Sequence, residues 1–132
     1  MADAKQILIV DDELDAVEFV TVVLEDVENV TTISANDGVS GLAKAKEAMP
    51  DLIILDVQMP GRGGFDVFAD LKKDNATKGI PVIMLTGVGE KAGIHFSGKD
   101  MGQFIGAEPD AYIEKPVDPA ELQKTVSGLL GL

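Results

Sequence analysis

The chain has 132 residues, 45% of them hydrophobic and 26% charged, which fits one globular domain with a single core. Its formal net charge of −12, from 23 acidic and 11 basic residues, argues against direct binding to nucleic acid or to an anionic membrane. The sequence contains no cysteine, which excludes disulfide bonds and thiolate metal sites.

Short apolar runs alternate with amphipathic segments along the chain. The runs are rich in Val, Ile and Leu on both pleat faces, which is typical of buried parallel strands, and they cover residues 7–10, 30–34, 52–55, 80–85 and 111–114. The segments with helical spacing cover residues 13–27, about 36–49, 65–74 and about 118–130. Asn36 or Asp37 can cap the second of these helices, and Asp118 the last. Strand and helix alternate without a hairpin signal, so we predict a doubly wound α/β domain with a parallel sheet.

The apolar stripes of the first two helices predict which side chains face the core. In the first helix the stripe consists of Leu14, Val17, Val20, Val23, Leu24 and Val27. In the second helix it consists of Val39, Leu42, Ala43, and Ala45 or Ala48.

One segment, Gly87–Gly106, departs from this alternation because it is long and rich in glycine. Only its later part, about 99–105, has a helical pattern, and a stretch of this kind is expected to be functional or mobile. Gly93, Gly98 and Lys99 have the spacing of a phosphate-binding loop, but Asp100 stands where the loop needs a hydroxyl. We therefore expect no nucleotide site there, and we expect His95 to be an exposed loop residue.

Polar side chains follow four of the predicted strands. Asp11 and Asp12 follow the first, Asp56 the third, Thr86 the fourth and Lys115 the fifth. Ligands of open parallel sheets bind at this carboxyl edge. Three carboxylates need a counter-ion, and hard oxygen ligands favour Mg²⁺ or Mn²⁺. The pattern indicates a site where Asp56 attacks a phosphoryl group and forms an acyl phosphate, with Thr86 and Lys115 binding the added oxygens.

These residues resemble the receiver domain of two-component response regulators, the CheY-like superfamily, over essentially the whole chain. The matching stretches are Asp11-Asp12, Leu55–Gly61, Leu85–Gly87 and Tyr112–Pro116. The resemblance implies a flavodoxin-like sheet of five strands in the order 2-1-3-4-5. It makes Asp56 the phospho-acceptor, which would receive its phosphoryl group from a histidine kinase or a phosphotransfer protein.

The resemblance also implies the ligands of the metal and of the phosphoryl group. Mg²⁺ would be held by Asp11, Asp12, Asp56 and the backbone carbonyl of Gln58. Lys115 would contact a phosphoryl oxygen.

Further positions match the switch elements of the family. Thr86 would move to bind the phosphoryl group, and Tyr112 would swing inward to fill the space that Thr86 leaves. The bond before Pro116 is a candidate for a cis peptide. Gln58 and Val88 occupy positions that tune the rate of dephosphorylation.

Each of these residues has an ordinary explanation when it is taken alone. Asp11 and Asp12 could form an acidic first turn at a helix start. Thr86 could be a turn residue, Tyr112 a packing residue and Lys115 a surface lysine. Their convergence on one edge of the sheet favours the functional interpretation.

The sequence departs from the family pattern in two places. More residues separate Thr86 from Lys115 than is usual, and the extra ones adjoin the face that commonly contacts output partners. Gly63-Gly64 stands where an acidic residue followed by Gly is common.

We therefore expect a phosphorylatable signalling switch that catalyses only its own phosphorylation and dephosphorylation. Because the sequence ends just after the last predicted helix, we expect one receiver domain over residues 1–132, without an output domain, that signals by docking to another protein. The start lacks a signal-peptide pattern, and no apolar stretch approaches the roughly 18 residues of a membrane span, so we expect a cytoplasmic protein.

Three alternatives are less well supported. A small Mg²⁺-dependent phosphohydrolase with Asp56 as nucleophile would usually carry a second Asp where Gln58 stands. A flavin-binding protein would need a phosphate-cradling loop where the acidic residues 11–13 stand. A receiver that signals without phosphorylation would not need every position of the acceptor site to be filled.

Overall fold

The computed structural model describes residues 4–59, 63–87 and 109–132. The strands are β1 (Lys5–Val10), β2 (Val30–Ala35), β3 (Leu52–Asp56), β4 (Val82–Thr86) and β5 (Ala111–Glu114). The helices are α1 (Leu14–Glu25), α2 (Gly38–Ala48), α3 (Gly64–Lys73) and α5 (Pro119–Leu130). None of the helices in these ranges is long and apolar enough to cross a membrane. Residues 88–108 lie outside the described residues, and with them the helix expected at about 99–105, Val88, His95 and the Gly93, Gly98 and Lys99 of the phosphate-loop spacing.

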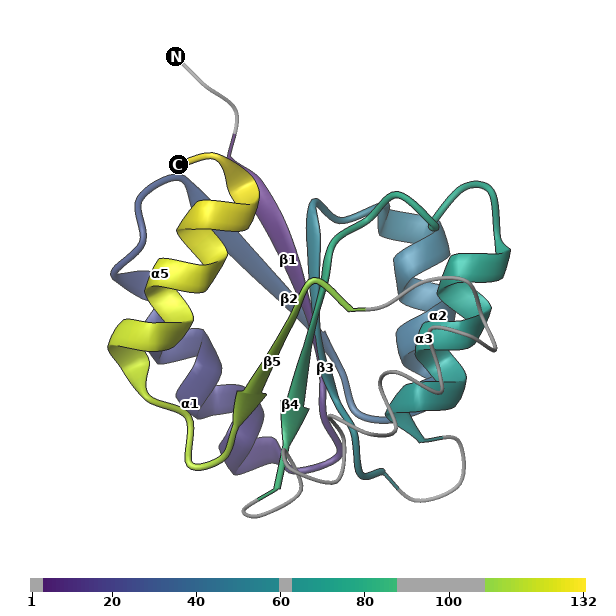
Figure 1. The fold of residues 1–132 in the computed structure, drawn as a ribbon, viewed down its shortest axis with the longest axis horizontal. Coiled ribbons are helices and arrows are strands. Elements are labelled where there is room, and N and C mark those ends of the chain that lie inside the picture. Colours follow the sequence, from purple (N-terminus) through teal and green to yellow (C-terminus); the bar gives the residue numbers. More distant parts are fainter. Residues whose placement is uncertain (1–3, 60–62, 88–108) are drawn as a thin grey trace.

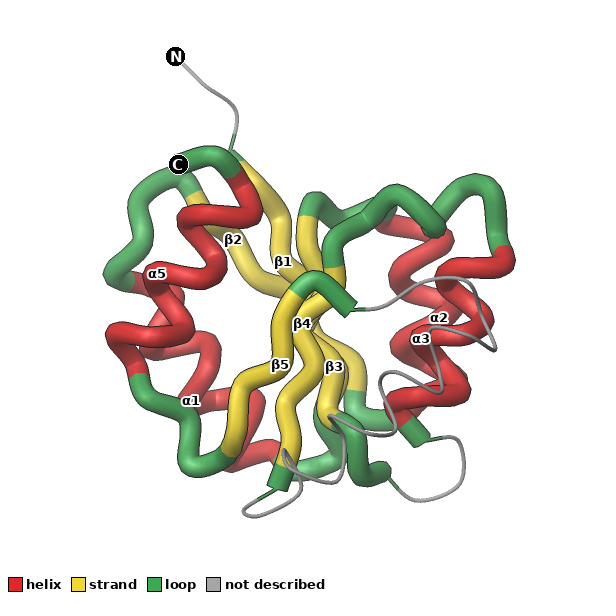
Figure 2. Tube along the Cα trace, viewed as in Figure 1, coloured by secondary structure: helices red, strands yellow, loops and turns green. Residues whose placement is uncertain are grey.

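The five strands form one parallel sheet in the order β2-β1-β3-β4-β5. Figures 1 and 2 show α1 and α5 on one side of this sheet and α2 and α3 on the other. The doubly wound α/β fold with strand order 2-1-3-4-5 is therefore confirmed.

Each face of the sheet has its own hydrophobic core. Alternate residues of β1 point to opposite faces, so Ile7 and Ile9 pack in the α1/α5 layer while Leu8 and Val10 pack in the α2/α3 layer. All residues of β3 and β4 are buried, which explains why those runs lack polar alternation. The cores hold the carboxyl ends of the central strands in a fixed relation to one another.

The strand and helix ends differ from the predicted ones by a few residues. Asp37 caps α2 by accepting the Ser40 N–H at 2.7 Å, and Asp118 caps α5 by accepting the Glu121 N–H at 2.9 Å. Strand β4 begins at Val82 and not at residue 80, because the N–H of Ile80 donates to a turn carbonyl and the next residue is a proline.

The predicted inner face of α2 is partly wrong. Val39 is 69% exposed and Ala43 is also exposed, whereas Gly38, Gly41 and Ala45 are buried. A β-carbon at Gly41 would lie only 2.7 Å from Cγ1 of Val10, so the helix lies too close to β1 for a larger residue. In α1, Leu14 belongs to the predicted stripe but is 73% exposed, since it stands at the first position of the helix.

Two aspartates, each preceded by proline, set the register at the starts of β3 and β5. The N–H of Asp51 donates to the Gln6 carbonyl at 2.8 Å, and its Oδ2 accepts the Gln6 N–H at 2.8 Å. Asp110 repeats this arrangement with Val82, at 2.9 and 2.8 Å. These bonds tie the start of β3 to β1 and the start of β5 to β4, and so help to align the polar residues at the opposite ends of these strands.

Candidate functional site

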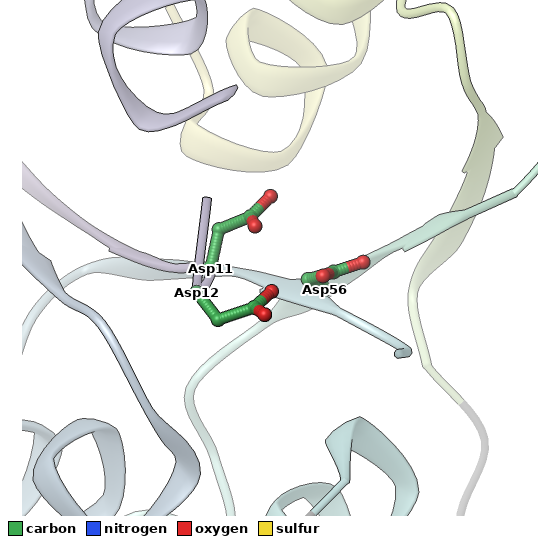
Figure 3. Close-up of side chains that lie close together, drawn as sticks. All are labelled: Asp11, Asp12 and Asp56. Atoms are coloured by element: carbon green, nitrogen blue, oxygen red, sulfur yellow. The ribbon is translucent and has the colours of Figure 1, made fainter. Parts of the chain in front are cut away.

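Three carboxylates meet at the carboxyl edge of the central strands. Asp11 and Asp12 directly follow β1, and Asp56 ends the adjacent strand β3, where Val10 pairs with Leu55. One oxygen from each carboxylate lies within 4.8 Å of the other two, and Figure 3 shows the three side chains together. Asp11 is 1% exposed and Asp56 is 3% exposed, while Asp12 is partly exposed.

Lys115 supplies the counter-ion for the two buried carboxylates. Its Nζ lies 3.2 Å from Oδ2 of Asp11 and 3.3 Å from Oδ1 of Asp56. Burial by itself would lower the pKa of Lys115, but the two carboxylates outweigh that effect and raise it. Lys115 is thus held as an ammonium ion at the point where Asp11 and Asp56 meet.

The carboxyl group of Asp56 is electrostatically strained even with this partner. Burial, followed by repulsion from Asp11, raises its pKa from 3.8 to about 6. The ammonium of Lys115 and a hydrogen bond from the backbone N–H of Gln58 oppose the shift. At neutral pH Asp56 is therefore mostly ionised, as a nucleophile must be, although its pKa is raised.

Asp11 has a structural role in addition to its charge. Its Oδ1 accepts the N–H of Glu13 at 3.0 Å, a turn that leads the chain into α1, while its Oδ2 faces Lys115. The helix-start interpretation of the acidic stretch and the functional interpretation therefore describe the same side chain. Asp12 is more exposed than Asp11, so its carboxylate is more accessible to solvent.

The remaining predicted residues surround this cluster. Thr86 ends β4 with 0% exposure, and its hydroxyl makes no hydrogen bond to any described residue. The Lys115 N–H donates to the carbonyl of Thr86 at 2.6 Å, which joins the ends of β4 and β5. Tyr112 lies on β5, partly buried against the core on the α2/α3 side.

Three further predicted positions follow strands in the sequence. Gln58 is exposed just after β3, and the Lys115–Pro116 peptide bond is cis. Val88 lies outside the described residues.

The donor set fits a hard divalent cation. Three carboxylates within 4.8 Å of one another carry more negative charge than one lysine balances, and all their donor atoms are oxygen. Asp11, Asp12 and Asp56 could therefore hold such an ion.

The sequence did not indicate what Lys115 does before any phosphoryl group arrives. It suggested a phosphoryl ligand, whereas the structure shows the counter-ion of Asp11 and Asp56. Three acids and one lysine at the same sheet edge were the available signal. The hydrogen bond from Gln58 to Asp56 could not be anticipated, because it depends on the path of the backbone after β3.

Comparisons with known proteins agree with this geometry. Residues 7–127 match the family model described as response regulator receiver domain. The chain therefore belongs to the receiver domain family of two-component systems, whose members generally act in signalling without enzymatic activity. The resemblance that the sequence motifs suggested is confirmed.

Two curated proteins match nearly the whole of this chain. The phosphate regulon transcriptional regulatory protein PhoB of Escherichia coli (strain K12) is 35% identical over 127 residues, covering 96% of this chain and 52% of PhoB. The DNA-binding response regulator MtrA of Mycobacterium tuberculosis (strain CDC 1551 / Oshkosh) is 36% identical over 126 residues, covering 96% and 50%. The chain thus spans about half the length of the curated relatives it matches.

Solved structures show the same fold along nearly the whole chain. A putative response regulator from Chloroflexus aurantiacus J-10-fl matches with a TM-score of 0.83 and 29% identity, covering 98% of this chain and 100% of that one. The chemotaxis response regulator CheY4 of Vibrio cholerae matches with a TM-score of 0.81 and 30% identity, covering 96% and 99%.

Proposed function

We propose that this chain is a phosphorylatable signalling switch that accepts a phosphoryl group on Asp56. The observation that carries the proposal is the contact of Lys115 with the buried carboxylates of Asp11 and Asp56, at an edge where Asp12 adds a third carboxylate. Burial of two carboxylates beside a third is costly unless cations compensate their charge, and carboxyl groups perturbed in this way cluster at functional sites. The natural donor would be the phosphohistidine of a histidine kinase or phosphotransfer protein.

The residues divide the work of the transfer. A carboxylate oxygen of Asp56 attacks phosphorus, the bond from phosphorus to the donor nitrogen breaks, and the donor imidazole leaves with its electron pair and takes up a proton. Lys115 lies 3.3 Å from Asp56 and can bind an oxygen of the incoming group. Thr86 has a buried hydroxyl that is free of hydrogen bonds to the described residues, so it can donate to another oxygen. Tyr112, on the next strand, is proposed to follow the movement of Thr86.

Mg²⁺ or Mn²⁺ is the cation that we propose for this site. Asp11, Asp12 and Asp56 would hold it, together with the backbone carbonyl of Gln58. Bound there, the cation would supply positive charge that favours the approach of the phosphoryl oxygens to Asp56.

A groove beside the acceptor supports a protein as donor. It has a volume of about 340 Å³ and is bordered by Lys115. Its apolar lining consists of Ala16, Phe19, Val20, Leu85, Pro116 and Val117. Phe19 is 45% exposed, so a donor protein could bury it while presenting its histidine to Asp56. Phe19→Ala is expected to slow transfer from a kinase that phosphorylates the wild type, but not transfer from a small phosphodonor.

Intact mass spectrometry tests the proposal. The protein is incubated with acetyl phosphate and Mg²⁺, and in parallel with EDTA. A mass gain of one phosphoryl group is expected with Mg²⁺ only, and it is expected to be lost in Asp56→Asn. No gain, or an equal gain in Asp56→Asn, would refute the proposal. Steady release of phosphate from phosphate esters would favour the phosphohydrolase instead.

A further inference from the structure

Gly64, the first residue of α3, lies against the backbone of the acceptor strand. A β-carbon at this position would overlap the carbonyl oxygen of Asp56 and lie 2.8 Å from Cα of Val57. Both neighbours are backbone atoms, so they cannot turn aside as a side chain can. The preceding residue, Gly63, differs sharply, because its β-carbon would meet only the Val57 oxygen at 3.6 Å, an ordinary contact.

The same glycine also bonds to the backbone just after Asp56. The N–H of Gly64 donates to the carbonyl of Val57 at 3.0 Å, and the N–H of Val57 donates to Leu85 at 2.9 Å. Val57 is therefore held by β4 on one side and by the start of α3 on the other. Met59 is 8% exposed and packs in the core of the α2/α3 layer.

Gln58 stands between Val57, which is held by backbone hydrogen bonds, and Met59, which is buried in the core. Its side chain is exposed, so the surroundings constrain it mainly through the backbone. The backbone N–H of Gln58 hydrogen-bonds the carboxylate of Asp56, and its carbonyl is a proposed metal ligand. A shift of the Val57 backbone would move both groups relative to the reacting carboxylate.

We propose that Gly64 is a positioning residue for the acceptor site. Because it has no side chain, α3 can close on Val57 and hold the backbone of Gln58 beside the Asp56 carboxylate. This inference rests on the proposed function, which it deepens. It also explains why Gly63 can stand where the family commonly has an acidic residue, since only the second glycine of the pair is required by space.

Three variants test the inference. Gly64→Ala introduces the overlap, Gly63→Ala is the matched control one residue away, and Val126→Ala removes volume from the other core, at a residue with 0% exposure, to lower stability without touching the site. Three quantities are measured for each folded variant: the Mg²⁺ dissociation constant from NMR titration, the rate of phosphorylation by acetyl phosphate, and the Gln58 amide resonance in metal-free protein.

Gly64→Ala is expected to weaken Mg²⁺ binding by about 10- to 100-fold. We expect phosphorylation to slow by up to about 100-fold, as for a misplacement of about 1 Å at a reacting group. The Gln58 amide resonance should shift without metal. Gly63→Ala and Val126→Ala should keep wild-type binding and rate once folded. Equal losses in Val126→Ala, or wild-type values in Gly64→Ala, would overturn the inference.

Two further points keep the result interpretable. If Gly64→Ala does not fold, amide hydrogen exchange of the wild type decides: the Gly64 amide should be as protected as those of β3, and free exchange would overturn the inference. If the wild type takes up no phosphate, the proposed function fails, whereas the metal-free Gln58 resonance still judges the role of Gly64.

Discussion

Replacing Asp56 by asparagine should stabilise the metal-free protein in a pH-dependent way. The pKa of Asp56 rises from 3.8 to about 6 on folding, because of burial and the nearby charge of Asp11. Between these values the folded protein binds more protons than the unfolded chain, so the free energy of unfolding falls as the pH rises. The full cost, about 3 kcal/mol at about 1.4 kcal/mol per pH unit, is present above pH 6. Asparagine keeps the shape but never ionises.

Urea denaturation in EDTA at several pH values measures this difference. Asp56→Asn should be more stable than the wild type by about 2–3 kcal/mol at pH 7.5, and the gap should close as the pH falls through 6 towards 4. Glu47→Gln is the control, since it removes the same charge at an exposed position and should stay within about 0.5 kcal/mol of the wild type. A gap that is absent at pH 7.5, or that does not change with pH, would refute the electrostatic account of this site.

Three other outcomes follow from the same structure. Mg²⁺ at 100 times its dissociation constant should raise the free energy of unfolding by about 2.7 kcal/mol, and EDTA should reverse this; thermal melts that ignore Mg²⁺ would contradict the metal site. Thr86→Val should stabilise the unphosphorylated protein by about 1 kcal/mol in urea titrations, because it removes a buried hydroxyl that has no hydrogen-bond partner among the described residues. A loss of stability would show that the hydroxyl does make a hydrogen bond. Gly128→Ala should raise stability by about 0.5–1 kcal/mol, since this position in α5 has open space around it; a loss would mean that the site is closed.

The sequence was sufficient for the sheet and for the composition of the site. Strands β3 and β4 are apolar up to their last residues, Asp56 and Thr86, so these two polar residues mark the strand ends clearly. Parallel strands bring such ends to one edge, which makes the convergence of Asp11, Asp12 and Lys115 predictable from chain order alone. That inference needs no knowledge of side-chain packing.

Packing explains what the sequence could not show. The buried face of α2 depends on how closely Gly41 approaches Val10. Hydrophobic periodicity instead predicts that Val39 faces the core, because glycine carries no apolar side chain. Likewise, hydrophobic periodicity does not distinguish Gly63 from Gly64, although of the two only a β-carbon at Gly64 would overlap the Asp56 carbonyl. Distances between backbones are properties of the assembled fold.

The central claim is that Asp56 carries the phosphoryl group, and the most direct test locates that group chemically. Protein treated with acetyl phosphate and Mg²⁺ is reduced with borohydride, which converts an aspartyl phosphate to homoserine, and the peptides are then sequenced by mass spectrometry. The account predicts homoserine at position 56 and at none of the other aspartates, with the signal absent in EDTA. Homoserine at Asp11 or Asp12, or phosphate that survives borohydride on another residue, would contradict it.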